Sequence, residues 1–290
     1  MATELGKIGV IADAFKLELR ENLLKAKEVG ADGVQIWATE GVMDPDNLGI
    51  DRRLDLKEYL DGLGLEVSAL CADFGGNGFH SAQDNIWKIE KSKKILTLAL
   101  ELGTPIVTTH IGIVPEDTNA PEYAIMQKAC NELAEFASSM GGYFAIETGP
   151  EPAARLKQFL DSLDSKGVAV NFDPANMVMV TGDDPVQGVY TLKDYIVHTH
   201  VKDGIRNREV NPHDVYGNLS HEQIAAFEDG SIGFQEVALG EGQVDFKAYF
   251  AALQDIGYTG YLTIEREVGQ QPEQDIRRAV EFIQGFKATV

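Results

Sequence analysis

Four polar residues stand at the ends of four consecutive apolar runs in the second half of the chain: Glu147, Asp173, His200 and Glu265. If the runs are parallel strands, their carboxyl ends meet at one rim and the four side chains converge. Three carboxylates at close range repel one another unless a cation lies among them. Mostly oxygen ligands with one histidine suit Mn²⁺ best, and Mg²⁺ or Co²⁺ would also bind. Any one of these residues alone would be read as structural; four in register indicate a metal site.

A repeated pattern along the chain supplies the strands. A helical stretch ends, a glycine such as Gly30 or Gly64 follows, and a short run of β-branched or aromatic residues begins. Glycine after a helix can adopt the left-handed conformation that ends it. Eight strands are predicted, over residues 8–11, 34–37, 65–70, 106–109, 143–146, 168–170, 195–200 and 261–264.

Helical periodicity separates the predicted strands, and alternating strands and helices form parallel sheets. An open doubly wound sheet is the alternative. It would place a glycine-rich turn after the first strand, where the sequence instead reads Ala12-Asp13-Ala14. We therefore predict one α/β domain over residues 1–290, a (β/α)8 TIM barrel.

One segment departs from this alternation of strands and helices. Residues 203–244 show no clear periodic element, so we expect a long loop after the seventh strand. Such a loop would cover the barrel mouth or pack on another subunit, which is compatible with a homo-oligomer.

Composition excludes several classes of protein. The 290 residues carry a formal charge of −21, which disfavours binding to nucleic acid or to an anionic membrane. No apolar run approaches the ~20 residues of a membrane span, and the start lacks the features of a signal peptide. The two cysteines, Cys71 and Cys130, are then expected to be reduced thiols, and the expected location is the cytoplasm.

Several short motifs, in this order, resemble the xylose-isomerase-like barrel superfamily of sugar isomerases and epimerases: Ile146-Glu147-Thr148-Gly149, Asn171-Phe172-Asp173-Pro174-Ala175-Asn176, His198-Thr199-His200-Val201-Lys202-Asp203, Leu239-Gly240-Glu241-Gly242 and Thr263-Ile264-Glu265. The resemblance covers nearly the whole chain. In the ketose 3-epimerases of this superfamily, four matching positions bind the metal, and the two glutamates among them are also the acid–base pair. The resemblance therefore implies these roles for Glu147, Asp173, His200 and Glu265.

The same resemblance implies two substrate contacts and contains one departure. An arginine six residues after the histidine contacts substrate in those epimerases, and Arg206 holds that position. They usually carry a second histidine three residues after the aspartate, where this chain has Asn176. Asparagine still hydrogen-bonds hydroxyl groups but does not change charge near neutral pH. The departure therefore bears on the identity of the substrate.

Three further residues are weaker candidates for substrate contacts. Trp37 ends the second strand and offers a face for stacking on a sugar, although a core or rim aromatic is an equal reading. His110 ends the fourth strand, where a structural imidazole is the alternative. Glu151 follows Gly149-Pro150 and faces either the pocket or solvent.

The expected function is a metal-dependent sugar isomerase or epimerase that removes a proton beside a carbonyl and passes through an enediolate. The expected partner is a small sugar. A keto-inositol dehydratase and a non-catalytic sugar-binding barrel remain as alternatives. An abasic-site endonuclease of the same superfamily is disfavoured by the charge of −21 and by only six histidines. The sequence does not specify the sugar, the carbon, phosphorylation or the oligomer.

Overall fold

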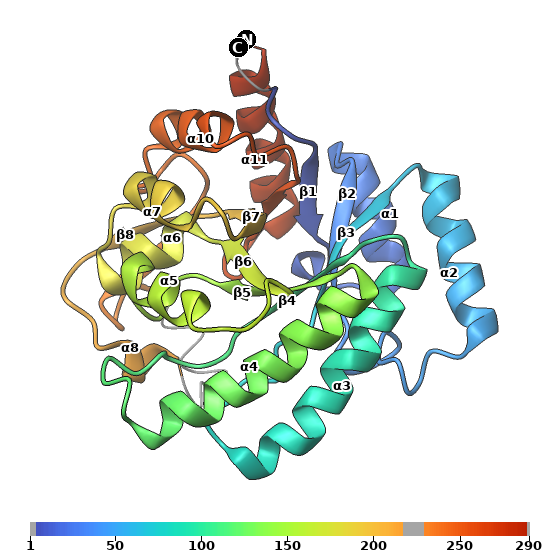
Figure 1. The fold of residues 1–290 in the computed structure, drawn as a ribbon. Helices are drawn as coiled ribbons and strands as arrows, with labels where there is room; N and C mark the ends of the chain where they lie inside the picture. Colours follow the sequence, from blue (N-terminus) through green and yellow to red (C-terminus); the bar gives the residue numbers. More distant parts are fainter. Residues whose placement is uncertain (1–3, 217–228, 289–290) are drawn as a thin grey trace.

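A closed barrel of eight parallel strands forms the centre of the protein (Figure 1). The computed structural model describes residues 4–216 and 229–288. Around the barrel the strands follow the order β1-β10-β7-β6-β5-β4-β3-β2. They are β1 (Ile8–Ile11), β2 (Gly33–Trp37), β3 (Glu66–Cys71), β4 (Ile106–Thr109), β5 (Tyr143–Glu147), β6 (Val168–Phe172), β7 (Ile196–Val201) and β10 (Leu262–Ile264). The predicted TIM barrel is confirmed.

Helices surround the barrel on its outer side (Figure 1). The longer ones are α1 (Leu19–Val29), α2 (Ile50–Leu63), α3 (Ala82–Glu101), α4 (Pro121–Met140), α5 (Ala153–Asp161), α7 (Pro185–Leu192), α10 (Phe246–Asp255) and α11 (Pro272–Lys287). Short pieces are η1 (Ala12–Phe15), α6 (Pro174–Asn176) and η2 (Met177–Thr181). Within the described ranges, no helix has the length and apolarity to cross a membrane.

The predicted signals for helix ends act as expected. Gly30 ends α1 with φ of 94° and Gly64 ends α2 with φ of 65°, both in the left-handed region that a side chain disfavours. Two helix starts are capped by side chains: Ser81 accepts a hydrogen bond from Asp84 N at α3, and Asp184 accepts from Val186 N at α7. These local signals mark where the helices begin and end, and therefore where the strands between them can lie.

The strands are apolar because both their faces are covered. Every residue of β1 and β6 is buried, one face against helices and the other inside the barrel. Parallel pairing then aligns the strand ends: Glu147 of β5 pairs with Asn171 of β6, and His200 of β7 pairs with Thr263 of β10. Polar residues at these ends are consequently held at one rim.

The segment after β7 contains regular structure that the sequence did not reveal. β8 (Asp203–Arg206) pairs antiparallel with β9 (Phe234–Val237), and α8 (Pro212–Val215) lies between them. The prediction that residues 203–244 lack any periodic element was therefore wrong for this hairpin. Its strands have four residues each, too short for alternation to be recognised. Part of the predicted loop, residues 217–228, lies outside the described residues.

Candidate active site

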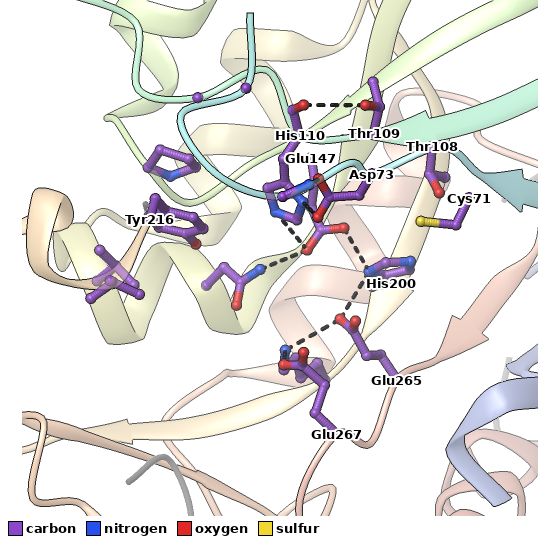
Figure 2. Close-up of a pocket in the computed structure, with 18 of the residues that line it drawn as sticks. Cys71, Asp73, Thr108, Thr109, His110, Glu147, His200, Tyr216, Glu265 and Glu267 are labelled. Carbon is purple, nitrogen blue, oxygen red and sulfur yellow. Dashed lines mark hydrogen bonds and ion pairs between the residues drawn. The ribbon is translucent and has the colours of Figure 1, made fainter. Parts of the chain in front are cut away.

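Glu147, Asp173, His200 and Glu265 come together at the carboxyl ends of β5, β6, β7 and β10. One ligand atom from each lies within 4.8 Å of all the others. His200 is central: its Nδ1 lies 3.0 Å from Glu265 Oε2, 3.4 Å from Glu147 Oε2 and 3.6 Å from Asp173 Oδ2. Figure 2 shows the carboxylates of Glu147 and Glu265 both directed at the same end of the His200 ring. The convergence expected from the strand ends is thus present.

Burial and mutual charge shape the protonation of this cluster. Burial raises the pKa of Glu147, and the nearby Glu265 carboxylate adds to that effect. Burial also opposes ionisation of Glu265, but Lys202 and His200 outweigh it and hold the pKa of that carboxyl below its usual value. Burial disfavours the imidazolium of His200, yet Glu265 and Glu147 hold its pKa well above the ordinary value.

The donor atoms fit a divalent cation. Within the part of the chain that the structure describes, the buried atoms Asp173 Oδ2 and Glu265 Oε2 accept no hydrogen bond. Glu265 Oε2 has the charged groups of His200 and Lys202 beside it, at 3.0 and 3.3 Å, whereas Asp173 Oδ2 has only the His200 ring, at 3.6 Å. A buried carboxylate oxygen without a donor is costly, so a cation bound among these oxygens would stabilise Asp173 above all. Three carboxylates and one imidazole are a ligand set that Mn²⁺ or Mg²⁺ binds.

Three amides hold the cluster in place. Gln35, in the middle of β2, has Oε1 3.0 Å from His200 Nε2 and so fixes the orientation of that ring. Asn176 Nδ2 donates to Glu147 Oε1 at 2.8 Å, and its backbone N donates to Asp173 Oδ1 at 2.9 Å. Asn171 Nδ2 donates to Glu147 Oε2 at 3.1 Å. His200, Glu147 and Asp173 therefore each have a neighbour that restricts their rotation.

A second pair lies beside Glu147. His110, at the end of β4, has Nδ1 3.2 Å from Asp73 Oδ2 and Nε2 3.6 Å from Glu147 Oε1 (Figure 2). Burial disfavours the charged imidazole, but Glu147 and Asp73 raise the pKa of His110 to about 10. A protonated His110 would present a donor next to the carboxylate cluster.

Lys202 links the cluster to a buried network of charges. Its Nζ lies 3.3 Å from Glu265 Oε2 and donates to Glu267 Oε2. Glu236, on β9, lies 3.7 Å from the same Nζ and is paired at 2.7 Å with Arg266 Nη1. Through Glu236 the hairpin therefore contacts Lys202 and also Arg266, which follows β10 and Glu265 in the chain.

A cavity of about 610 Å³ opens over the cluster. Its size is within the range of small-molecule sites. Of the predicted substrate contacts, Asn176, His110 and Trp37 line this cavity together with Glu147, His200 and Glu265. Asp173 lies beneath them, fully buried.

Two predicted substrate contacts do not line this cavity. Glu151 is buried and its Oε2 accepts from Val114 N at 3.0 Å, so it holds two loops together instead. Arg206 ends β8, where its Nε donates to Arg208 O at 3.2 Å and its guanidinium packs on Gly182. In the hairpin Arg206 pairs with Phe234, which does line the cavity, while the Arg206 side chain packs on Gly182 instead.

Several lining residues were missed by the sequence reasoning. Asp73, Tyr216 and Glu267 line the cavity from loops, where strand periodicity gives no signal. Gln35 did give a signal in the sequence, because a polar residue between Val34 and Ile36 is unusual in a buried strand. Lys202 also lines the cavity, and in the sequence it stood out only as part of a motif.

A family model described as xylose isomerase-like TIM barrel matches residues 23–286. A crystal structure of a xylose isomerase domain protein from Planctomyces limnophilus is 25% identical, covers 100% of this chain and 98% of that one, and superposes with a TM-score of 0.78. A D-tagatose 3-epimerase-like protein is 21% identical, covers 96% and 97% of the two chains, and has a TM-score of 0.71.

Among curated sequences, the inosose dehydratase of Lacticaseibacillus casei is 28% identical over 141 residues, which are 49% of this chain and 42% of that protein. The alignment therefore spans less than half of the curated relative. A likeness of this extent carries no activity over to the present chain.

Proposed function

This chain belongs to the family of xylose isomerase-like TIM barrels, and from that premise we propose that it is a divalent-metal-dependent sugar isomerase or epimerase. The observation that carries the proposal is the buried cluster of three carboxylates and one imidazole at the floor of the cavity. The fold alone would not justify it, since barrels of this kind perform many reactions. The cluster is the feature that specifies chemistry.

Glu147, Asp173, His200 and Glu265 would hold the ion, with Mn²⁺ as the preferred species. When bound, a divalent cation acidifies a C–H bond beside a carbonyl by withdrawing charge from the oxygen atoms of the substrate. Gln35 and Asn176 restrain His200 and Glu147 through the contacts given above. Trp37 would stack on the apolar face of the sugar ring.

Glu147 and Glu265 are proposed as the acid–base pair. They end strands three steps apart around the barrel, so they face a bound sugar from different sides. One removes the proton from the carbon beside the carbonyl, and the other returns a proton to the opposite face, which inverts that carbon. If the proton is returned to the former carbonyl carbon instead, the reaction interconverts an aldose and a ketose.

A dehydratase is the second candidate. The likeness to inosose dehydratases favours it, and His110 is the residue that supports it by position. His110 lies in the cavity 3.6 Å from Glu147, which suits a donor to a leaving hydroxyl after Glu147 has taken the proton. The substrate would then be a cyclic ketone that bears a hydroxyl beside the acidic carbon.

Solvent exchange tests both candidates. The Mn²⁺-loaded protein would be incubated in deuterated water with a panel of ketoses, aldoses and keto-inositols, and deuterium uptake and products read by NMR. Uptake without loss of water supports the isomerase or epimerase, and loss of water supports the dehydratase. Binding of sugars with no exchange and no product in the whole panel would make the protein a sugar-binding barrel.

A further inference from the structure

A second cavity adjoins the one above the cluster. It measures about 720 Å³ and is lined by the loops after β2 and β3 and by the first half of α3. Two residues, Trp37 and Asp73, line both cavities, so the two cavities adjoin at these side chains. The first cavity already has the volume of a typical small-molecule site. The pair together offers more room than one sugar ring requires.

Both tryptophans of the chain face the second cavity, and both are partly exposed. Trp37 is 38% exposed and Trp87 is 51% exposed. Trp37 is fixed by a hydrogen bond from its Nε1 to Thr39 Oγ1 at 2.8 Å. Trp87 packs edge-on against Phe74, with ring centroids 5.1 Å apart. Exposed indoles held in this way form preorganised surfaces for stacking.

The polar lining indicates a neutral ligand rich in hydroxyl groups. Lys91 and Lys94 both pair with Asp46, at 2.8 and 2.6 Å, and Lys91 also pairs with Asp44, so the two ammonium groups are balanced by two carboxylates. Glu40 and Glu90 add two more carboxylates to the wall. An anionic group would meet this excess of carboxylates, whereas hydroxyl groups can bond to both carboxylates and ammonium groups.

We propose that the second cavity binds a second sugar ring that is linked to the reacting unit. The reacting unit lies over the carboxylate cluster, the linkage passes between Trp37 and Asp73, and the outer ring stacks on Trp87. The substrate class is then a disaccharide or glycoside rather than a free monosaccharide. This assignment of the reacting unit rests on the proposed function, but binding in the second cavity is measurable without turnover.

Tryptophan fluorescence gives a direct readout. In a Trp37→Phe variant, Trp87 is the single reporter and lies away from the carboxylate cluster. The variant would be titrated, loaded with Mn²⁺, with D-fructose and with three disaccharides that contain it: lactulose, isomaltulose and turanose. We expect at least one disaccharide to shift Trp87 emission and D-fructose not to do so.

A second variant tests the stacking. Trp87→Ala should weaken disaccharide binding, measured by calorimetry, about threefold to tenfold and should leave the D-fructose affinity within about twofold. The matched control is Tyr190→Ala, an exposed aromatic residue on α7 that lines neither cavity. It should change neither affinity.

The outcomes separate this inference from the proposed function. Equal binding of D-fructose and all three disaccharides, with no change at Trp87, overturns the second-ring site even where solvent exchange occurs. Disaccharide binding at Trp87 without any solvent exchange supports the site and contradicts the proposed reaction. A change of oligomeric state in Trp87→Ala, seen by light scattering, would show that a second copy of the chain covers the cavity and would also overturn the inference.

Discussion

At the residue scale, Asp173 and His200 are the two proposed metal ligands that the acid–base scheme does not use. Replacing either by alanine should reduce bound Mn²⁺ from about one ion per chain to a small fraction, because each change removes one of the four residues that would coordinate the ion. Metal analysis after dialysis measures this. Glu241→Ala is a matched control, since Glu241 is exposed and belongs to another of the motifs. Full metal retention in both ligand variants would contradict the site.

Glu147 and Glu265 are the residues at which binding and proton transfer can be separated. Glutamine keeps the shape and one ligating oxygen but cannot accept the proton. Each Glu→Gln variant should retain its fold and part of its metal, yet lose turnover by about 10²–10⁴-fold. Turnover at saturating Mn²⁺, with metal occupancy measured on the same sample, tests this. Near-normal turnover at full occupancy would mean that another residue is the base.

Asn176 acts on Glu147 through a single hydrogen bond. Asn176→Ala removes the donor to Glu147 Oε1 but keeps the backbone N–H that binds Asp173. Affinity for Mn²⁺ should fall about tenfold to a hundredfold, as for other residues that orient a ligand. Calorimetry with Mn²⁺ measures it, and Asn77→Ala, at an exposed position near the mouth, is the control. Unchanged affinity would leave substrate contact as the role of Asn176.

At the scale of elements, Asp203 fastens the hairpin to the barrel. Its carboxylate accepts from the backbone N–H groups of Gly204, Gly240, Gly242 and Val244, at 2.8–3.2 Å. This explains why the two motifs that contain Asp203 and Gly240-Glu241-Gly242 occur together. The hairpin in turn carries Glu236, which pairs with Arg266 and approaches Lys202.

Asp203→Ala should therefore lower the free energy of unfolding by about 3 kcal/mol, because four backbone donors, of which those of Gly204 and Val244 are buried, lose their acceptor. Urea denaturation measures the loss, and amide exchange should rise first at Gly240 and Gly242. Asp245→Ala is the matched control: this exposed residue caps α10 through one bond to Ala248 N, at 3.0 Å, and should cost only about 1 kcal/mol. Equal losses in the two variants would argue against a special role for Asp203.

The strands were predictable because each signal is local. A glycine at the end of a helix and a run of apolar residues mark Val34 to Trp37 and Ile106 to Thr109 without knowledge of the rest of the chain. The four residues of the cluster follow from the strand ends. The pairing of Asp73 with His110 does not, since it depends on how the loop after β3 folds over β4. Arg206 shows the same limit, because a spacing of six residues does not fix the path of a hairpin.

At the scale of the whole molecule, the buried carboxyl groups make stability depend on pH. Glu151 is the simplest case, because it is 2% exposed and lies outside the carboxylate cluster. Burial raises the pKa of Glu151 from 4.5 to about 7, although Val114 N donates a hydrogen bond to it. Between pH 4.5 and about 7 the folded protein consequently holds one more proton at this site than the unfolded chain does.

The direction in which stability changes with pH follows from this additional proton. Because the folded state binds the additional proton, the contribution of Glu151 to stability decreases as pH rises through that window and is smallest above pH 7. Glu151→Gln keeps an oxygen for Val114 N but cannot ionise. The variant should therefore exceed the parent protein in the free energy of unfolding at pH 8 by up to about 3 kcal/mol, and the difference should shrink towards pH 5. Urea denaturation of both proteins across this range measures the difference directly, and other titrating groups cancel in it. A difference that stays constant with pH would mean that Glu151 ionises equally in the folded and unfolded states, in which case the hydrogen bond from Val114 N offsets the effect of burial on its pKa.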